Sequence, residues 1–396
     1  MSTNPVTYAT KYLTFFPGYC RPPLSSSIKK HHFHHSLAWE REIKKHHFHH
    51  KLAWERERER ERERESFMES DKGMVCVTGG TGYLATWTIM RLLEKGYSVR
   101  ATVRPDPDRK RDISFLTNLA KGPQSLQIFH ADLSDPESFA PAIEGCVGVF
   151  HMAATIDFHG REPEAVLTER AVRGAVGILK ACSSAGTVRR VVYTSSSAAV
   201  HGNATSAETM DEGFWTDVEM VRRLKTAEGP YMVSKTLAEK AVLDAGARMG
   251  LDVVVVVPSF MIGPFLCPKL PASIGIALAM VLGDANPYKN VCLSKTSVVH
   301  PDDVARAHIY LFEHLPAKGR FICSSDVITL EETAELLSQR FPELPVPSPS
   351  ALKEIRGYSM PRLSSRKLLD IGFEFKHRPE DMLDGAIRSC RENGYV

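Results

Sequence analysis

The chain has 396 residues, of which 43% are hydrophobic and 24% are charged. This balance is typical of a globular protein with one large domain or two smaller ones. Residues 1–67 hold 13 Lys and Arg against 8 Glu, whereas the remainder holds 37 basic and 39 acidic residues. The remainder therefore has a net charge of −2, which gives no electrostatic reason to expect binding to nucleic acid or to a membrane surface.

The longest apolar run, "IGIALAMVLG" at 274–283, predicts a buried helix. A membrane span needs ~18 consecutive apolar residues, so we expect none. None of the eight cysteines forms a CxxC pair or has zinc-ligand spacing. Several, such as Cys76 in "MVCVTG", lie in apolar runs. We therefore expect reduced core thiols in a reducing compartment, the cytoplasm.

Two copies of a 15-residue sequence, "IKKHHFHHSLAWERE" and "IKKHHFHHKLAWERE", fill residues 28–57, and alternating Glu and Arg follow. A GAGAGA dinucleotide repeat encodes such alternation, so we interpret residues 1–67 as translated low-complexity nucleic acid before a native start at Met68. The charged run has no apolar face to pack, which predicts a disordered or loosely helical extension. A histidine metal site is the alternative, because His tracts bind nickel or zinc adventitiously.

A short apolar strand, "MVCV", precedes "TGGTGYLA" and a segment with helical apolar spacing, "TWTIMRLLEKG". In this order Gly79 allows a tight turn, and Gly82 lets the backbone approach a pyrophosphate. Tyr83 and Leu84 are further predicted cofactor contacts, and Ala85 stands where a third glycine is usual. The GxxGxxA spacing resembles the TGxxGxxG signature of short-chain dehydrogenases/reductases. It predicts an α/β fold with a Rossmann-type doubly wound parallel sheet in residues 68–260.

The second predicted strand, "YSVRATVR", ends at Arg104, and "DRKR" follows at 108–111. An NAD site would favour an acidic residue here, to hold the ribose 2′-hydroxyl. Arg104, Lys110 and Arg111 can instead bind a 2′-phosphate, so we expect NADPH/NADP+ as the cofactor. The alternative interpretation is an ordinary solvated basic turn.

The next two predicted strands supply further cofactor contacts. "LQIFHADL" ends in Asp132 and Leu133, where an acidic residue commonly hydrogen-bonds the adenine amino group. "GVFHMAA" contains His151, for which a hydrogen-bonded buried side chain is favoured over a catalytic role. The same strand brings three residues to the cofactor ribose: Met152, Ala153 and Ala154.

A catalytic constellation follows. "RRVVYTSSSAAV" at 189–200 predicts a strand ending in hydroxyls, and Tyr231 begins "YMVSKTLAEKAV" 35 residues after Ser196. Tyr231 and Lys235 are i and i+4 on a helix, so they share one face. Carbonyl reduction needs a proton for the oxygen, and a phenol with a pKa near 10 donates it more readily when lysine and oxidised nicotinamide charges lower that pKa. We expect Ser196 to hold the substrate oxygen, and Tyr231 and Lys235 also to contact the cofactor.

The apolar run "VVVVVPSFMIGP" at 253–264 predicts a buried strand that Pro258 ends. Residues 261–396 are expected to build mainly a smaller substrate-binding lobe, with some segments returning to the Rossmann domain. "VHPDDVARAHIYLFE" at 299–313 predicts a turn and an amphipathic helix, with Asp302 as a helix N-cap in preference to a catalytic acid. The backbone after the buried strand would meet the nicotinamide carboxamide, at Pro258, Ser259, Phe260 and Met261.

From Met74 to Val396 the chain resembles plant dihydroflavonol reductase-like enzymes of the extended short-chain dehydrogenase/reductase group. The resemblance rests on "RKRDISFLTNL", "ADLSDPESFAPAIEGCVGVFH", "YMVSKTLAEKAVL", "PFLCPKLPASI", "DDVARAHIYL" and "GFEFKHRPEDML". It implies catalytic roles for Ser196, Tyr231 and Lys235, and it adds Ser273 to the cofactor contacts. The "NWYCYGK"-type segment of cinnamoyl-CoA reductases is absent.

Three positions depart from the pattern of this family. His201, with Asn203 nearby, stands five residues after Ser196, where dihydroflavonol reductases usually place an Asn that binds flavonoid hydroxyls. Thr155 replaces the usual proline, and the alanine at position 85 is shared with anthocyanidin reductases. These changes leave hydride transfer intact and bear on the identity of the flavonoid.

The sequence therefore predicts an NADPH-dependent reductase of a flavonoid or isoflavonoid carbonyl, which converts a 4-ketone to a 4-alcohol. Activity like that of dihydroflavonol 4-reductase or anthocyanidin reductase, or reduction of other phenolic aldehydes and ketones, is the enzymatic alternative. A catalytically silent NADP-binding sensor is the alternative of another class. We expect a monomer with a small phenolic substrate as its partner, no nucleic acid and no bound metal.

Overall fold

The computed structural model describes residues 72–108, 111–120, 122, 124–155, 162–205, 207–283, 286–287, 293–352 and 357–396. The predicted extension at 1–67 and the predicted phosphate ligand Lys110 lie outside the described residues. All of the described residues belong to one compact unit, Glu69–Val396.

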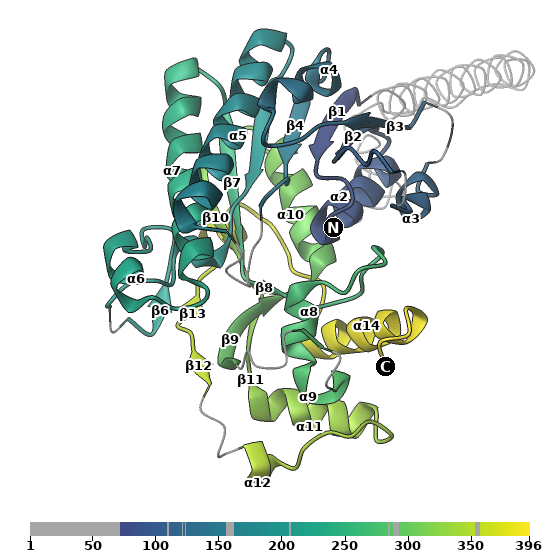
Figure 1. Cartoon of the computed structure of the whole chain (residues 1–396), viewed down its shortest axis with the longest axis vertical. Coiled ribbons are helices and arrows are strands. Elements are labelled where there is room, and N and C mark those ends of the chain that lie inside the picture. Colours follow the sequence, from purple (N-terminus) through teal and green to yellow (C-terminus); the bar gives the residue numbers. More distant parts are fainter. Residues whose placement is uncertain are drawn as a thin grey trace, which may run out of the picture. The chain divides into compact units, whose positions relative to one another are not determined.

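Seven strands form the central sheet, in the order β10-β7-β5-β4-β1-β2-β3 (Figure 1). Every neighbouring pair is parallel. The order reverses between β1 and β4, and doubly wound sheets bind ligands beyond the carboxyl ends of the strands at such a point. The strands are β1 (Met74–Thr78), β2 (Ser98–Val103), β3 (Leu126–His130), β4 (Gly148–His151), β5 (Arg190–Thr194), β7 (Val253–Pro258) and β10 (Gly319–Cys323).

Helices cover both faces of this sheet, which explains why its central strands are rich in valine. In β7, Val254 and Val256 join the hydrophobic cluster under α2 (Tyr83–Glu94) and α10 (Pro301–Glu313). Val255 and Val257 join a second cluster on the opposite face. The helices α5 (Glu164–Ala185) and α7 (Gly229–Met249) pack against each other over that face (Figure 1).

Shorter elements connect these layers. They comprise the helices α3 (Ser114–Thr117), α4 (Ala140–Ile143), α6 (Val218–Leu224) and α13 (Arg366–Asp370), the 3-10 turns η2 (Pro136–Phe139) and η3 (Ser197–Ala199), and the paired strands β6 (Thr209–Met210) and β13 (Arg362–Leu363).

A second sheet lies in the later part of the chain, where β9 pairs with β8, β11 and β12. A third hydrophobic cluster contains side chains from this sheet and from the helices beside it. The strands are β8 (Phe260–Met261), β9 (Leu293–Val299), β11 (Asp326–Thr329) and β12 (Tyr358–Ser359). The helices are α8 (Ala272–Ala277), α9 (Ala279–Leu282), α11 (Leu330–Arg340), α12 (Pro349–Leu352) and α14 (Pro379–Glu392).

The prediction of one buried helix at 274–283 is wrong, because the segment contains two short helices, α8 and α9. The backbone leaves helical geometry at Leu278, with φ −102° and ψ 16°. The Asn286 side-chain amide donates a hydrogen bond of 2.7 Å to the carbonyl of Gly275. That carbonyl would accept the N–H of residue 279 in a continuous helix, so a contact from outside the segment reaches the backbone at the break.

The prediction that Asp302 is a helix N-cap is also wrong, although Asp302 does have structural contacts. His300 caps α10, and its Nδ1 accepts the Asp302 backbone N–H at 3.1 Å. The Asp302 carboxylate, in the first helical turn, pairs with Arg91 of α2 at 2.5 Å and with His377 at 3.0 Å. An imidazole nitrogen can accept a backbone N–H as an aspartate oxygen does, so His300 serves as the cap while the Asp302 carboxylate is paired elsewhere.

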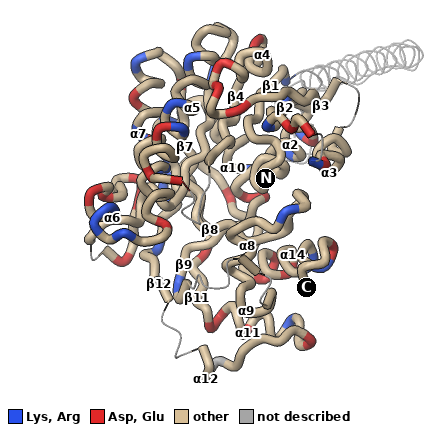
Figure 2. The backbone as a smooth tube through the Cα atoms, in the orientation of Figure 1, with Lys and Arg blue, Asp and Glu red and all other residues tan. Residues whose placement is uncertain are grey.

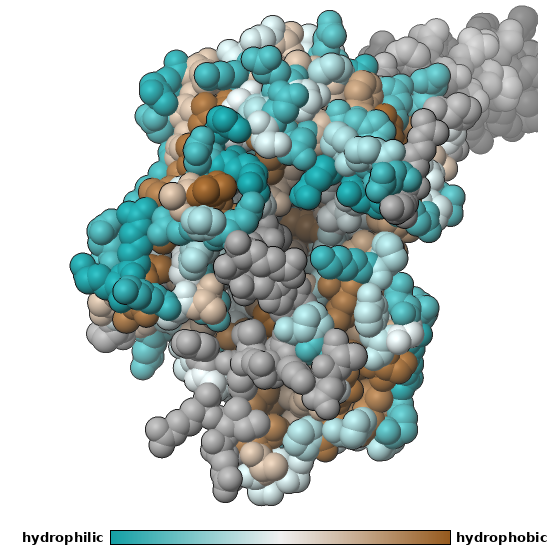
Figure 3. All heavy atoms as spheres, in the orientation of Figure 1, coloured by the Kyte–Doolittle hydropathy of each residue, from teal (hydrophilic) through white to brown (hydrophobic). Residues whose placement is uncertain are grey.

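Basic and acidic residues are interspersed along α5, α6 and α7 (Figure 2). Hydrophobic residues on this side of the molecule form separate areas among hydrophilic ones (Figure 3). No helix in the described part of the chain combines the length and apolar character of a membrane span. The exposed large hydrophobic side chains of the described residues come from separate places along the chain: Val166, Leu224, Leu315, Leu369 and Val396.

Candidate active site

The glycine turn after β1 is held by the neighbouring strand. The N–H of Gly80 donates to the Thr102 carbonyl at 2.7 Å, and the N–H of Gly79 donates to the Thr102 hydroxyl at 3.1 Å. Gly79 has φ +72°, and a Cβ on it would lie 2.9 Å from the Cα of Ala153. Gly82 is the N-cap of α2, and no side chain caps the helix. The first N–H groups of α2 are therefore available to an anion, as a pyrophosphate site requires.

Thr78, the last residue of β1, fixes the end of β4 beside this turn. Its hydroxyl oxygen accepts the N–H groups of Met152 and Ala153, both at 3.0 Å. Its own proton then goes to Nδ1 of His151, 2.9 Å away, because a hydroxyl has one donor and two acceptor positions. Burial, aided by the charge of Lys235, lowers the pKa of His151 to about 3. The prediction of a hydrogen-bonded buried histidine is confirmed.

Two of the three predicted phosphate ligands lie together at the end of β2. A guanidinium N–H of Arg111 donates to the Arg104 carbonyl at 2.9 Å, and both side chains are exposed. The Arg104 Nε lies 3.7 Å from a carboxylate oxygen of Asp132. The Ser134 hydroxyl and N–H, with a smaller contribution from Arg104, lower the pKa of Asp132. This end of the sheet therefore presents two exposed cations and one ionised carboxylate.

Four more of the predicted cofactor contacts are Leu133, Ala154, Tyr83 and Leu84. Leu133 is partly buried and packs on the second hydrophobic cluster, where it meets Gly174 of α5. Ala154 follows β4 next to Ala153, outside any helix or strand. Tyr83 and Leu84 form the first turn of α2, and the Tyr83 hydroxyl donates to the carbonyl of Gly263 at 3.0 Å.

The three predicted catalytic residues lie beyond the carboxyl end of β5. Ser196 follows β5 and is the N-cap of η3, where its hydroxyl accepts the Ala198 N–H at 3.2 Å. The Tyr231 phenol, in the first turn of α7, is hydrogen-bonded to the Ser196 side chain. One helical turn later, the Lys235 ammonium donates to the carbonyl of Thr194 at 3.1 Å. The strand end and the helix thus bring together Ser196, Tyr231 and Lys235.

Burial acts in opposite directions on the two ionisable groups of this set. It raises the pKa of Tyr231, while the hydrogen bond with Ser196 opposes the rise. It lowers the pKa of Lys235 to about 8, while the charge of Glu239 opposes the fall. Near neutral pH, Tyr231 is therefore a protonated phenol, ready to donate, and Lys235 is mostly an ammonium.

Ser259 marks the predicted nicotinamide end of the site. Its N–H donates to the Cys323 carbonyl at 3.0 Å, which holds the turn between β7, ending at Pro258, and β8, formed by Phe260 and Met261. The Ser259 hydroxyl is buried and has no hydrogen-bond partner among the described residues. Buried polar groups rarely lack partners, so this hydroxyl fits a carboxamide ligand. The remaining predicted contact, Ser273, lies in the first turn of α8.

His201 carries a second buried polar atom without a partner. Its Nε2 has no hydrogen bond within the described part of the chain, and burial lowers the pKa of the imidazole to about 4. The amide of Asn203 donates to the carbonyl of Val200 at 2.8 Å. The sequence departs from the family pattern at His201 and Asn203. Of these two residues, His201 is the one whose side chain has an unused hydrogen-bonding atom.

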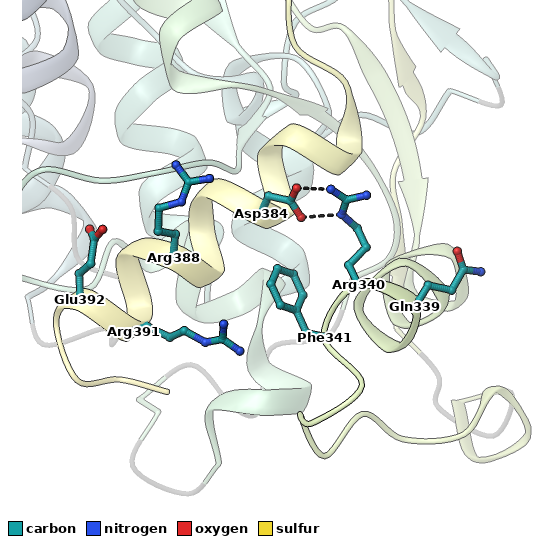
Figure 4. Close-up of a pocket in the computed structure, with 7 residues that line it drawn as sticks. All are labelled: Gln339, Arg340, Phe341, Asp384, Arg388, Arg391 and Glu392. Carbon is teal, nitrogen blue, oxygen red and sulfur yellow. Dashed lines mark hydrogen bonds and ion pairs between the residues drawn. The ribbon is translucent and has the colours of Figure 1, made fainter.

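A cavity of about 560 Å³ lies elsewhere, between α11 and α14 (Figure 4). Its charged lining side chains are partly paired with each other, as Arg340 is with Asp384. Arg388 and Arg391 extend from α14 in different directions and do not converge on one point (Figure 4). None of the predicted site residues lines this cavity, so it is not part of the candidate active site.

Sequence reasoning missed the residues that hold the site together. Thr102 is a single hydroxyl whose partner lies 23 residues away, and no local pattern marks it. Thr78 had a signal, because it is the threonine that opens the TGxxGxxG-type motif, but its partners Met152 and Ala153 are far along the chain. Glu239 had a detectable signal, since it lies four residues after Lys235 on the same helical face. Its partner Arg320 is 81 residues away and had none.

Comparison with known proteins shows the family of the chain. Residues 75–323 match the NAD dependent epimerase/dehydratase family. The chain belongs to this family. It is therefore a nicotinamide-dependent oxidoreductase, and the predicted family, Rossmann-type fold and cofactor class are confirmed.

Plant reductases are among the most similar relatives. Vestitone reductase of Medicago sativa is 51% identical over 329 residues, which cover 83% of this chain and 100% of that protein. Its crystal structure matches with a TM-score of 0.74 at 49% identity, over 82% of this chain and 100% of that chain. Protein BRI1-5 ENHANCED 1 of Arabidopsis thaliana is 47% identical, over 82% of this chain and 90% of that protein. Dihydroflavonol 4-reductase of Zea mays is 42% identical, over 83% and 91% respectively.

We predict that Gly79→Ala weakens NADPH binding at least ~10-fold, equivalent to about 1.4 kcal/mol. The new Cβ would press on Ala153 at the point where the backbone approaches the cofactor. Gly186→Ala is the matched control, because Gly186 has a similar φ of +66° but nothing within 4 Å of its Cβ position. A fluorescence titration with NADPH measures both dissociation constants, and equal values in the two variants would contradict the assignment.

Proposed function

We propose that the chain is an NADPH-dependent reductase of a flavonoid or isoflavonoid carbonyl, converting a ketone to an alcohol as vestitone reductase-like enzymes do. The observation that carries this proposal is the placement of Lys235, whose ammonium donates to the carbonyl of Thr194 at the end of β5 at 3.1 Å, with Tyr231 one helical turn before it on α7 and Ser196 beside the phenol. The names of the relatives support a carbonyl substrate of this class. The buried free thiols of the described cysteines support a location in the reducing cytoplasm.

The residues fit the proposed cofactor along its whole length. The turn at Gly79 and Gly82 would hold the pyrophosphate at the start of α2. Arg104 and Arg111 would pair with a 2′-phosphate, which favours NADPH over NADH. The unpartnered Ser259 hydroxyl would bond the carboxamide. When bound, the nicotinamide supplies the hydride for the carbonyl carbon.

The chain itself supplies the proton. The Ser196 hydroxyl, already hydrogen-bonded to Tyr231, would hold the substrate oxygen beside the phenol. Tyr231 donates its proton to that oxygen as the carbon–oxygen double bond becomes single, and a phenolate remains on the tyrosine. The Lys235 ammonium stabilises this phenolate by its charge. All three groups are fixed by β5 and α7 before substrate arrives, which reduces the entropy lost on reaction.

A panel of carbonyl compounds tests the proposed function. We predict NADPH oxidation with flavanones, isoflavanones or dihydroflavonols that is at least ~10-fold faster, in kcat/KM, than with simple aromatic aldehydes. The measurement is the loss of NADPH absorbance together with identification of the alcohol product. Binding of NADPH without turnover of any carbonyl would favour a cofactor sensor instead.

We also predict that Tyr231→Phe lowers kcat at least ~100-fold while the dissociation constant for NADPH stays within about twofold, since only the proton donor is lost. Wild-type turnover should fall as the pH rises above about 8, where Lys235 loses its proton. Tyr97→Phe is the control, because the Tyr97 hydroxyl bonds Glu313 at the amino end of the sheet. Full activity of Tyr231→Phe would refute the assignment of the acid.

A further inference from the structure

A buried carboxylate that the mechanism does not use lies behind the catalytic residues. Glu239 is on α7, one turn after Lys235, and its side chain is fully buried. It accepts the hydroxyl proton of Ser195, the neighbour of the catalytic Ser196. It also accepts the Nε–H of Arg320, whose second nitrogen lies 3.5 Å from the other carboxylate oxygen. Glu239 thus touches the catalytic strand end and shares a helical face with the catalytic lysine.

Arg320 links Glu239 to the segment from 212 to 215. From β10, at the edge of the sheet, its guanidinium donates to the carbonyls of Glu212 and Phe214, at 2.9 and 2.8 Å. It also lies 3.6 Å from the centre of the Trp215 ring. The segment from 212 to 215 is therefore fixed to the same ion pair as Ser195.

This segment leads directly to the loop that carries Ser196. The Thr216 hydroxyl donates to the carbonyl of Ala198 at 2.7 Å and accepts the N–H of Gly202 at 3.0 Å. The Thr216 N–H donates to the carbonyl of Ala199 at 3.0 Å. The loop 195–202 is consequently held at two places. Ser195 is hydrogen-bonded to Glu239, and Thr216 follows the segment that Arg320 holds.

We propose that Glu239 is a positioning residue of the active site, which fixes the Ser195–Ser196 strand end and supplies the Lys235 ammonium with a fixed negative charge. This inference rests on the proposed reductase function. A carboxylate in a site without water is costly unless it is paired and fully hydrogen-bonded. Arg320 and Ser195 supply those bonds, and they oppose the rise in the pKa of Glu239 that burial causes.

The charges around Lys235 agree with this role. On its own helix it meets the carboxylate of Glu239 and the neutral phenol of Tyr231. From β5 it faces the Tyr193 ring at 5.8 Å, and from β4 it faces His151, whose pKa of about 3 keeps it neutral. Glu239 is thus the anion that opposes the effect of burial on the pKa of Lys235, and the Arg320 cation from β10 lies behind it.

The test variant removes the charge of Glu239 and keeps the shape of its side chain. In Glu239→Gln, the midpoint of Lys235 titration should move about one pH unit below its wild-type value, because the opposing anion is lost. Protein labelled with ¹³C at the lysine ε-carbons reports this midpoint by NMR, and the Lys235 signal is assigned by its absence in Lys235→Met. The fall of kcat at high pH should move by the same amount, so that kcat at pH 8 drops ~5- to 10-fold.

Asp252→Asn is the matched control. It also removes the carboxylate of a pair with a buried arginine, Arg190, at 2.6 Å, but at the amino ends of β5 and β7. It should lower the melting temperature and leave the Lys235 midpoint unchanged. Ser195→Ala tests the positioning of the strand end. It should lower kcat, while Lys235 still titrates above its midpoint in Glu239→Gln, because Arg320 still pairs with the Glu239 carboxylate.

If Glu239→Gln does not fold because Arg320 is left unpaired, the double variant Glu239→Gln with Arg320→Gln removes both charges and should still lower the midpoint. An unchanged midpoint in the folded variant would overturn the proposal. The NMR titration needs neither cofactor nor substrate. Its outcome therefore stands apart from the substrate panel, whose failure would concern the reductase function alone.

Discussion

The burial of the Lys235 ammonium is the constraint on which the rest of the active site depends. A cation without water is unstable unless fixed dipoles and opposite charges replace its hydration. The Thr194 carbonyl supplies a dipole at 3.1 Å, and Glu239 supplies the charge. With these partners Lys235 keeps its proton near neutral pH, next to the phenol that must part with one.

The parallel sheet explains why the other site residues meet at the same place. The carboxyl ends of β1, β4 and β5 lie side by side, so the glycine turn, the Ala153 backbone and Ser196 all come from one edge. Hydrogen bonds between the ends of the strands then set the spacing of these residues. Thr78 ties β1 to β4, Thr102 ties β2 to the turn, and Tyr83 ties α2 to Gly263 at the entrance to the smaller sheet.

Features defined by local sequence were predictable. The strand, turn and helix around Gly79 follow from residue order, and the pairing of Tyr231 with Lys235 follows from helical spacing. Features that depend on distant partners were not. The helix break at Leu278 is accompanied by the contact between Asn286 and Gly275. The Asp302 carboxylate pairs with Arg91 and His377, which are far along the chain, and His300 is the cap of α10. The ion pair of Glu239 with Arg320 joins α7 to β10, and no sequence pattern in either element predicts this pair.

The central claim is that the charge of Lys235 makes the Tyr231 phenol a useful acid and stabilises the phenolate it becomes. The direct measurement is the pH dependence of kcat in the wild-type protein and in Lys235→Met. Near pH 7, where Lys235 is mostly an ammonium, the account predicts a kcat at least ~100-fold lower in Lys235→Met, and it predicts that this variant lacks the fall of kcat above about pH 8. The same kcat and the same pH profile in both proteins would contradict it.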